Sequence, residues 1–155
     1  MPYNELRLDS QLCVRLYTAS RLVIQAYYPF LEKINLTYPQ YIVMLILWEK
    51  DNITVGEISE RLLLETNTLT PLLKRMEKEG LISKKTSPKD TRQKIISLTK
   101  KGKDLEEQAL EVPRCMQDFL LSNNINEEDL SSIIPVMDNL IDTLKNINPS
   151  FKTTK

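Results

Sequence analysis

Apolar residues recur every three or four positions near both ends of the chain, which is the spacing of one helix face. In the opening segment this pattern runs from about Asp9 to Ile34, and Pro29 predicts a bend or a break within it. The closing segment runs from Asn126 to Ile147, and Pro135 predicts a kink or a split. The two apolar stripes consist of Leu12, Leu16, Val23, Tyr27, Phe30, Leu31 and Ile34, and of Leu130, Ile133, Met137, Leu140, Leu144 and Ile147. Both ends are therefore expected to be long amphipathic helices.

The middle of the chain begins with the start signals of two shorter helices. Thr37-Tyr-Pro-Gln40 and Thr54-Val-Gly-Glu57 both match the capping box, in which a threonine and a residue three positions later satisfy each other's backbone N–H groups. The first box predicts a helix that ends near Lys50. The second predicts a short helix that continues through Leu63.

A third helix is expected to begin between Thr66 and Thr68 and to hold Pro71 in its first turn. Gly80 is placed to end it. A short helix, a tight turn and a second helix with a polar amino-terminal face together predict a helix-turn-helix.

Two short segments after this unit alternate apolar and polar residues, as half-buried strands do. They are Leu81–Thr86 and Lys94–Leu98, and the polar stretch Ser87–Gln93 between them is typical of a turn. Two strands with a basic tip directly after a helix-turn-helix predict a wing. A further helix is expected over Thr99–Leu121, with Pro113 interrupting it.

These elements predict a mainly α fold, a winged helix-turn-helix with long terminal helices and a two-stranded β wing. The 155 residues suit a single domain, with a DNA-binding core over 37–99 and helices over 1–36 and 100–147. The core of one small domain does not need two long apolar stripes. A second copy would bury them, so we interpret the terminal helices as the interface of a homodimer.

The amino-acid composition excludes several classes of catalytic and metal site. The chain has no histidine, which excludes serine–histidine triads and histidine metal ligands. Two cysteines cannot form a zinc site by themselves, so no metal or cofactor is expected. The start of the chain lacks a basic, apolar signal segment, no apolar run is long enough for a membrane span, and a cytoplasmic location is the expectation.

Charge is strongly segregated, although the net charge is zero. Residues 74–103 hold eleven basic and three acidic side chains, whereas residues 104–147 hold two basic and ten acidic ones. A basic block of this kind is a candidate phosphate-binding surface. The alternative interpretation is an ordinary solvated helix face.

Several stretches of the chain resemble the MarR family of regulators, specifically the branch that senses organic hydroperoxides. They lie between about Leu12 and Gly102. The stretches are Gln11-Leu-Cys13, Leu36-Thr-Tyr-Pro-Gln-Tyr41, Leu47-Trp-Glu49, Leu69-Thr-Pro-Leu-Leu-Lys-Arg-Met-Glu77, Gly80-Leu-Ile82 and Ile96-Ser-Leu-Thr99. The resemblance implies a helical dimer that binds double-stranded DNA and has one wing per subunit.

The recognition helix is expected over Thr66–Glu79. The side chains placed to meet base edges are Thr66, Asn67, Thr68 and Thr70, because asparagine can pair with adenine and threonine methyls can contact thymine. Lys74 and Arg75 suit phosphate contacts, which fix register without reading sequence. Helix capping is the alternative role for the threonines. The family usually has glycine where Asn67 stands, which leaves the base preference open.

The resemblance implies that Arg92 at the wing tip enters the minor groove while Asp90 holds its guanidinium. The alternative is an ordinary exposed turn. Phosphate contacts would come from Lys84, Lys85, Lys89 and Lys94. A two-fold dimer would place its recognition helices about one DNA turn apart, on a pseudo-palindromic operator.

Cys13 lies one helical turn before Tyr17, and the resemblance places Tyr17, Tyr27 and Tyr38 around a sensing thiol. Tyr27 and Tyr38 are expected to reach it from the partner subunit, although adjacent Tyr28 could replace Tyr27. Phenolic hydroxyls can stabilise a thiolate, which an organic hydroperoxide or another oxidant would convert to a sulfenic acid. A small buried core residue is the alternative for Cys13.

Cys115 is the candidate for the second cysteine that one branch of this family uses to form a disulfide with the sensing one; an inert thiol is the alternative.

Three other functions compete with a peroxide-sensing repressor. They are a regulator of the same fold induced by an aromatic ligand or hypochlorite, a thiol peroxidase using Cys13 and Cys115, and a helical interaction module. We favour a regulator over an enzyme, because the sequence lacks an alternating βα pattern.

Overall fold

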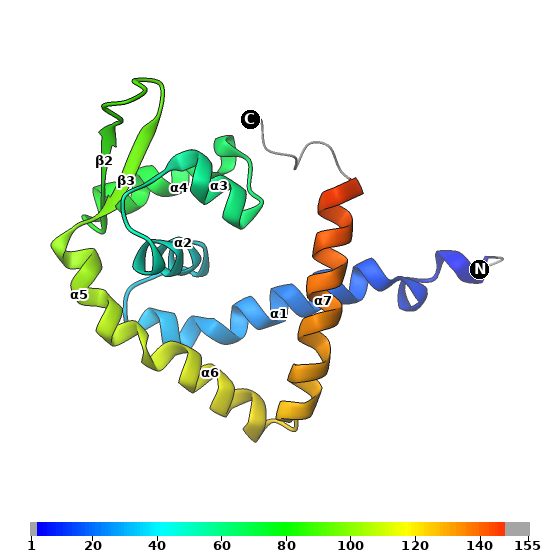
Figure 1. Ribbon diagram of the computed structural model, residues 1–155. Coiled ribbons are helices and arrows are strands. Elements are labelled where there is room, and N and C mark those ends of the chain that lie inside the picture. Colours follow the sequence, from blue (N-terminus) through cyan, green and yellow to red (C-terminus); the bar gives the residue numbers. More distant parts are fainter. Residues whose placement is uncertain (1–2, 148–155) are drawn as a thin grey trace.

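The computed structural model describes residues 3–147 and confirms the winged helix-turn-helix with long terminal helices (Figure 1). Two short 3₁₀ turns, Asn4–Leu6 and Leu8–Ser10, precede the first helix. The elements that follow are α1 (Leu12–Glu32), α2 (Tyr38–Glu49), β1 (Ile53–Thr54), α3 (Val55–Leu62), α4 (Thr66–Lys78), β2 (Ile82–Thr86), β3 (Lys94–Leu98), α5 (Lys100–Ala109), α6 (Glu111–Ser122) and α7 (Glu127–Ile147).

Figure 1 shows two parts that differ in shape. Helices α2, α3 and α4 and the wing strands form one rounded unit, which we call the winged unit. Helix α6 packs along α1 beneath this unit, and α7 turns away from the end of α6 to stand apart from it. No helix among residues 3–147 is long and apolar enough to cross a membrane.

Both predicted capping boxes form. Thr37 Oγ1 accepts from the Gln40 N–H at 3.5 Å, and the Gln40 side-chain oxygen accepts from the Thr37 N–H at 2.9 Å. In the second box, Thr54 Oγ1 accepts from the Glu57 N–H at 3.1 Å, and Glu57 accepts in return at 2.8 Å. These bonds set the first residues of α2, which contains Tyr38, and of α3, which precedes α4.

The wing has the predicted strands and one more. Strands β2 and β3 pair antiparallel from Ile82 opposite Leu98 to Thr86 opposite Lys94. The short β1 pairs with the other edge of β3, where Ile53 lies opposite Ile96, so the sheet order is β1-β3-β2. Two residues give no alternation to detect, which is why the sequence pattern missed β1.

The prolines interrupt the helices less than the sequence analysis expected. Pro29 and Pro135 lie inside α1 and α7, and neither helix is split. Both are exposed, so water can bind the carbonyl groups that they leave without a donor. Pro71 was expected in the first turn of its helix, but α4 begins at Thr66 and Pro71 lies in its second turn. The break before α6 falls at Leu110, ahead of Pro113, since proline is accepted in a first turn.

The core lies in the winged unit and where α5 and α6 join it. Its most buried side chains include Val43, Met44, Leu47, Ile58, Leu69, Leu73, Met76 and Ile96. Gly102 secures α5 to this core, because a Cβ there would lie only 2.2 Å from the Leu81 carbonyl oxygen. Its own carbonyl accepts a hydrogen bond from the Trp48 indole at 2.9 Å. The wing and the dimerisation helices are therefore held to one rigid centre.

Candidate DNA interface and thiol site

The amino-terminal face of α4 presents the polar side chains that the sequence singled out. Thr66, Asn67, Thr68, Thr70, Lys74 and Arg75 are all exposed. The helix cap is Glu65, which makes no side-chain capping bond, so capping does not account for the threonines. Thr70 instead donates to the Thr66 carbonyl at 2.7 Å. Thr66, Asn67 and Thr68 are thus exposed at the start of α4, where the Thr68 hydroxyl donates to Asn67 Oδ1 at 3.4 Å.

The wing tip is an ordered turn and not a loose loop. Buried Ser87 accepts through its Oγ from the N–H groups of Lys89 at 3.3 Å and Asp90 at 3.4 Å. Asp90 Oδ1 accepts from the Arg92 backbone at 3.0 Å and from Arg92 Nε at 3.2 Å. The Arg92 side chain is nevertheless 90% exposed. An arginine directed outward by a neighbouring carboxylate has the geometry expected of a minor-groove contact.

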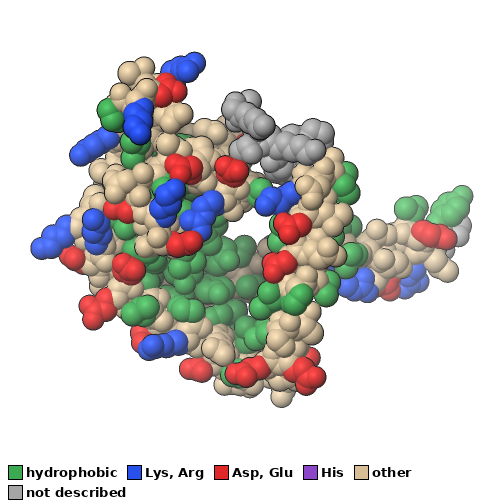
Figure 2. Space-filling view, viewed as in Figure 1, with side chains coloured by type: hydrophobic (Ala, Val, Ile, Leu, Met, Phe, Trp, Pro, Cys, Tyr) green, Lys and Arg blue, Asp and Glu red, His purple; other side chains and the backbone are tan. Residues whose placement is uncertain are grey.

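Basic side chains surround the recognition helix and wing. Lys84 and Lys94, from the two wing strands, line a shallow cavity of about 320 Å³ together with Thr66 and Thr70 of α4. Lys94 also donates to Thr86 at 2.7 Å, which holds its amine near the wing. Figure 2 shows Lys and Arg side chains over the wing and the adjoining surface, and apolar side chains between the winged unit and α7. Part of the basic block, namely Lys84, Arg92 and Lys94, thus lies beside Thr66 and Thr70 of α4.

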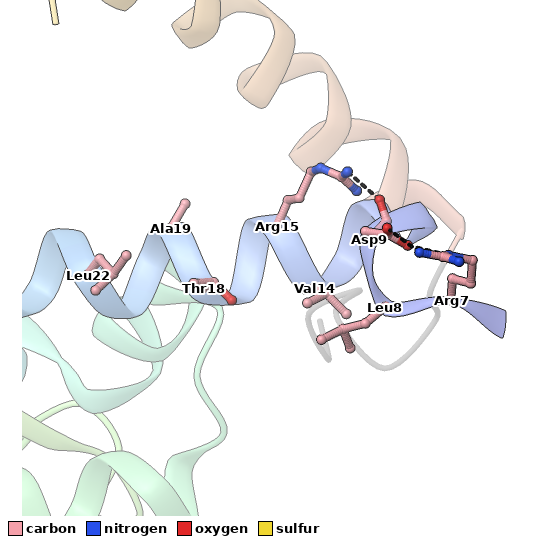
Figure 3. Close-up of a pocket in the computed structure, with 8 residues that line it drawn as sticks. All are labelled: Arg7, Leu8, Asp9, Val14, Arg15, Thr18, Ala19 and Leu22. Carbon is pink, nitrogen blue, oxygen red and sulfur yellow. Dashed lines mark hydrogen bonds and ion pairs between the residues drawn. The ribbon is translucent and has the colours of Figure 1, made fainter. Parts of the chain in front are cut away.

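Cys13 lies at the exposed start of α1, outside the core of its own chain. Tyr17, one turn later, is 64% exposed and has the Arg21 guanidinium 5.5 Å from its ring centre. An open groove of about 870 Å³ runs along another face of α1; it is lined by Leu8, Val14, Ala19 and Leu22 among others, and neither Cys13 nor Tyr17 lines it. Figure 3 shows Leu8 and Val14 close together below the start of α1, and the contact of Arg15 with Asp9 above them. An open apolar groove along α1 has the character of a surface that a partner covers.

Tyr27 and Tyr38 form the centre of an aromatic cluster at the other end of α1. Their ring centres are 5.2 Å apart, and the ring centre of Tyr41 lies 6.1 Å from Tyr27 and 6.4 Å from Tyr38. Burial raises the pKa of the Tyr27 phenol, and nearby Tyr38 adds to the rise. Tyr27 therefore keeps its proton and can donate. Tyr28 is 67% exposed and lies outside this ring cluster, although it lines a cavity together with Tyr38.

The thiol and this cluster cannot meet within one chain. Fourteen residues of continuous helix separate Cys13 from Tyr27, which corresponds to about 21 Å along the axis. Cys115 is distant for the same reason, because Phe119, one turn beyond it, stacks at 6.4 Å on Phe30 near the end of α1. A disulfide needs Cα atoms within about 7 Å. Any contact of Cys13 with Tyr27 or Cys115 therefore requires a second subunit.

Comparison with known proteins places the chain in a family. Residues 25–108 match the family model described as transcriptional regulator SarA/Rot. The organic hydroperoxide resistance transcriptional regulator of Bacillus subtilis is 41% identical over 146 residues, which cover 94% of this chain and 97% of that protein. The solved structure of reduced AbfR bound to DNA is 36% identical with a TM-score of 0.76, covering 95% of this chain and 99% of that one.

The chain is a MarR-family transcriptional regulator. Within the family it groups with the organic hydroperoxide regulators, as its motifs indicated. Another relevant likeness is the structure of disulfide-formed AbfR, which is 35% identical with a TM-score of 0.60 and covers 92% of this chain and 93% of that one.

Two features of this MarR-family regulator escaped sequence reasoning. Tyr41 is buried beneath Tyr27 and Tyr38; its place three residues after Tyr38 on one helix was a usable signal, since such residues share a face. The other is a hydrogen bond of 2.7 Å from the Gln40 side chain to Glu79 at the end of α4. Thirty-nine positions separate its partners, so no local pattern could reveal it.

Proposed function

We propose that this protein is a homodimeric, cytoplasmic repressor that binds a pseudo-palindromic operator and is released when a hydroperoxide oxidises Cys13. The observation that carries the proposal is the pairing of Tyr27 with Tyr38 far along α1 from an exposed thiol. In an antiparallel dimer, each phenol pair would face the thiol of the other subunit. The likeness to the Bacillus subtilis organic hydroperoxide resistance regulator supports the oxidant class.

The chemistry needs only the thiol and the peroxide. The Cys13 thiolate attacks one peroxide oxygen, the O–O bond breaks, and the alkoxide leaves and takes a proton to become an alcohol. Cys13 is then a sulfenic acid, oxidised by two electrons. Phenolic hydroxyls from Tyr17, and from Tyr27 and Tyr38 of the partner, would stabilise the thiolate beforehand. The added oxygen would no longer fit among them, which would bias the dimer away from its DNA-binding arrangement.

Cys115 is proposed as the second thiol. Its sulfur would attack the sulfenic sulfur of Cys13 in the other subunit, forming a disulfide and releasing water. The likeness to the structure of disulfide-formed AbfR supports this role. A reductant would restore both thiols, so the switch would be reversible.

The DNA contacts divide into two kinds. Thr66, Asn67, Thr68 and Thr70 would read base edges in the major groove, with Arg92 held by Asp90 in the minor groove. Lys74, Arg75, Lys89 and Lys94 would contact phosphates and make binding strongly dependent on salt. The structure of reduced AbfR in complex with DNA supports this mode of binding for the present chain.

The test is fluorescence polarisation with a labelled duplex from upstream of the protein's own gene. Binding would be followed before cumene hydroperoxide, after it and after dithiothreitol, with Cys13→Ser and Cys115→Ser in parallel. We expect the wild type to lose the duplex on oxidation and regain it on reduction, while Cys13→Ser stays bound. No binding at low salt would refute the DNA function, and release of Cys13→Ser by peroxide would refute the thiol switch.

A second candidate is induction by a small aromatic ligand. A cavity of about 460 Å³ between α1 and the start of α2 favours it, since Ile24, Leu31, Leu36 and Pro39 give it an apolar lining beside Tyr38. In that case an aromatic acid would release DNA from Cys13→Ser as well as from the wild type. A thiol peroxidase would instead show many turnovers of peroxide with a thiol reductant in the absence of DNA.

A further inference from the structure

Gln40 is a buried polar side chain whose amide is bonded on both sides. It is 4% exposed and belongs to the first turn of α2, two residues after Tyr38 and directly before Tyr41. Its carbonyl accepts from the Thr37 N–H at 2.9 Å and from the Thr37 hydroxyl at 3.2 Å. Its NH₂ donates to Glu79 Oε2 at 2.7 Å. Gln40 thus fixes the start of α2 and reaches the far end of the recognition helix with the same group.

Glu79 is at a corner where several elements meet. It follows the last residue of α4, and its backbone carbonyl accepts from Lys101 of α5 at 2.8 Å. The next carbonyl, that of Gly80, accepts from the Thr99 hydroxyl at 2.6 Å. A shift of Glu79 would therefore be passed to the recognition helix and to the segment that leaves the wing.

We propose that the Gln40–Glu79 hydrogen bond is the positioning contact that couples the tyrosine cluster to the recognition helix. The inference rests on the proposed function. It makes Gln40 and Glu79 positioning residues that contact neither peroxide nor bases. In the DNA-binding arrangement the bond holds the end of α4. When Cys13 oxidation displaces Tyr38, the first turn of α2 moves, and Gln40 cannot keep Thr37 and Glu79 together.

The geometry favours coupling through the Gln40–Glu79 hydrogen bond over coupling spread across many contacts. Tyr38 and Gln40 are two residues apart in a capped first turn, where the side chain of Gln40 closes the cap. Movement of one residue therefore disturbs the hydrogen bonds of the other. A buried amide with both ends satisfied has two discrete states, bonded or broken, because an unsatisfied buried polar group is costly. Such a two-state contact is what coupling between distant sites needs.

The test uses three substitutions at the end of α4. Glu79→Ala removes the acceptor and a negative charge, whereas Glu79→Gln removes the charge and keeps an acceptor oxygen. Glu77→Ala is the charge control, because Glu77 is exposed and its carboxylate has no hydrogen bond or ion pair within residues 3–147. Dissociation constants for the operator duplex would be measured for each reduced protein and after cumene hydroperoxide.

For Glu79→Ala we expect the Kd of the reduced form to rise about fivefold or more, while the Kd of the oxidised form stays unchanged. The ratio of the two constants then falls. Glu79→Gln and Glu77→Ala should bind as tightly as the wild type or tighter, because removing a negative charge favours DNA binding. Weakening by Glu79→Ala would therefore run against its electrostatic effect. A purely structural role would instead lower affinity in both redox states and lower the melting temperature.

The outcomes separate the inference from the function beneath it. Unaltered DNA binding of the wild type after peroxide would overturn the proposed function, and the inference with it. A wild type that responds, with a Glu79→Ala variant that binds as tightly when reduced and responds by the same factor, would overturn the inference alone. Equal weakening by Glu79→Gln would also overturn it, since that variant keeps the acceptor.

Discussion

The winged unit and the terminal helices differ in how far their apolar side chains are buried. Within the winged unit, Leu69, Met76 and Ile96 are completely buried by neighbours of the same chain. On the terminal helices, Leu22 of α1 and Ile133 and Leu144 of α7 are more than half exposed, and no residue of α7 is buried. A single chain therefore buries the apolar side chains of the part that would meet DNA, but it leaves apolar side chains exposed on the helices that carry the thiol and form the end of the chain.

This difference explains why binding and sensing are divided as they are. The recognition helix and wing keep their geometry without help, so a single subunit already presents one DNA half-site surface. The proposed Cys13 environment would form only where two subunits meet, because about 21 Å of helix separates Cys13 from Tyr27. Oxidation can then change the relation between two rigid units without unfolding either, which suits a reversible switch.

The largest effect is expected from placing a charge in the exposed stripe of α7. Ile133→Lys should prevent dimerisation, because a buried lysine at the interface would lack a partner. Loss of the second half-site should weaken operator binding by about a hundredfold or more. Sedimentation velocity would give the oligomeric state, and fluorescence polarisation the affinity.

Asn139→Lys is the matched control for that variant, since it adds the same charge at an exposed position outside the apolar stripe, about 120° around α7 from Ile133. It should remain a dimer and bind the operator normally. If Ile133→Lys also remained a dimer with unchanged affinity, the exposed apolar stripe of α7 would not be part of the dimer interface.

A smaller but still large effect is expected at the wing tip. Arg92→Ala should weaken operator binding about tenfold, with the greatest loss on A·T-rich flanks where a narrow minor groove attracts arginine. Lys89→Ala, on the same turn, should weaken all duplexes about equally and lower the salt slope by about one. Salt titrations on two duplexes that differ only in the flanks distinguish them. Equal losses on both flanks for Arg92→Ala would exclude minor-groove reading.

The tyrosine cluster supports a sharper comparison, between two adjacent phenols. Tyr27→Phe should slow oxidation of Cys13 about tenfold by removing a hydrogen bond to the thiolate. Tyr28→Phe should leave the rate unchanged, because that ring lies outside the cluster. Stopped-flow measurement of thiol loss with cumene hydroperoxide gives both rates. A slower Tyr28→Phe with a normal Tyr27→Phe would show that the wrong tyrosine had been assigned.

Most of the fold was accessible from the sequence, because its elements are specified locally. Both capping boxes, the alternation in the wing strands and the glycine after α4 gave correct boundaries to within a few residues. Of the interruptions expected at Pro29 and Pro135, the break and the split do not occur. Pro29 and Pro135 are compatible with unsplit helices because both lie on exposed faces, and exposure is not a property of the local sequence.

The site was predictable only where it depends on type and spacing. The polar face of α4 and the pair Asp90–Arg92 follow from the pattern together with the family resemblance, and the structure gives them compatible geometry. The choice of Tyr27 over Tyr28 needed burial, and the link from Gln40 to Glu79 needed tertiary contacts. Sequence reasoning thus identifies the groups that can act, whereas their coupling depends on packing between distant segments.

The smallest effect concerns the winged unit alone, where one carboxylate supports the helix before the recognition helix. The pKa of Glu57 is lowered, chiefly by the Thr54 backbone hydrogen bond and next by the bond from Lys50. A lowered folded-state pKa means that this stabilisation is fully present above the ordinary value of 4.5 and is lost as pH falls through the folded-state value. Glu57→Ala should therefore reduce the free energy of unfolding by about 1 kcal/mol at pH 7, and by progressively less in acid.

Urea unfolding at pH 7, 5 and 3 measures this loss, with Glu77→Ala as the control for removing an exposed carboxylate. A deficit that stayed constant down to pH 3 would mean that lost packing, and not the charged cap, is responsible.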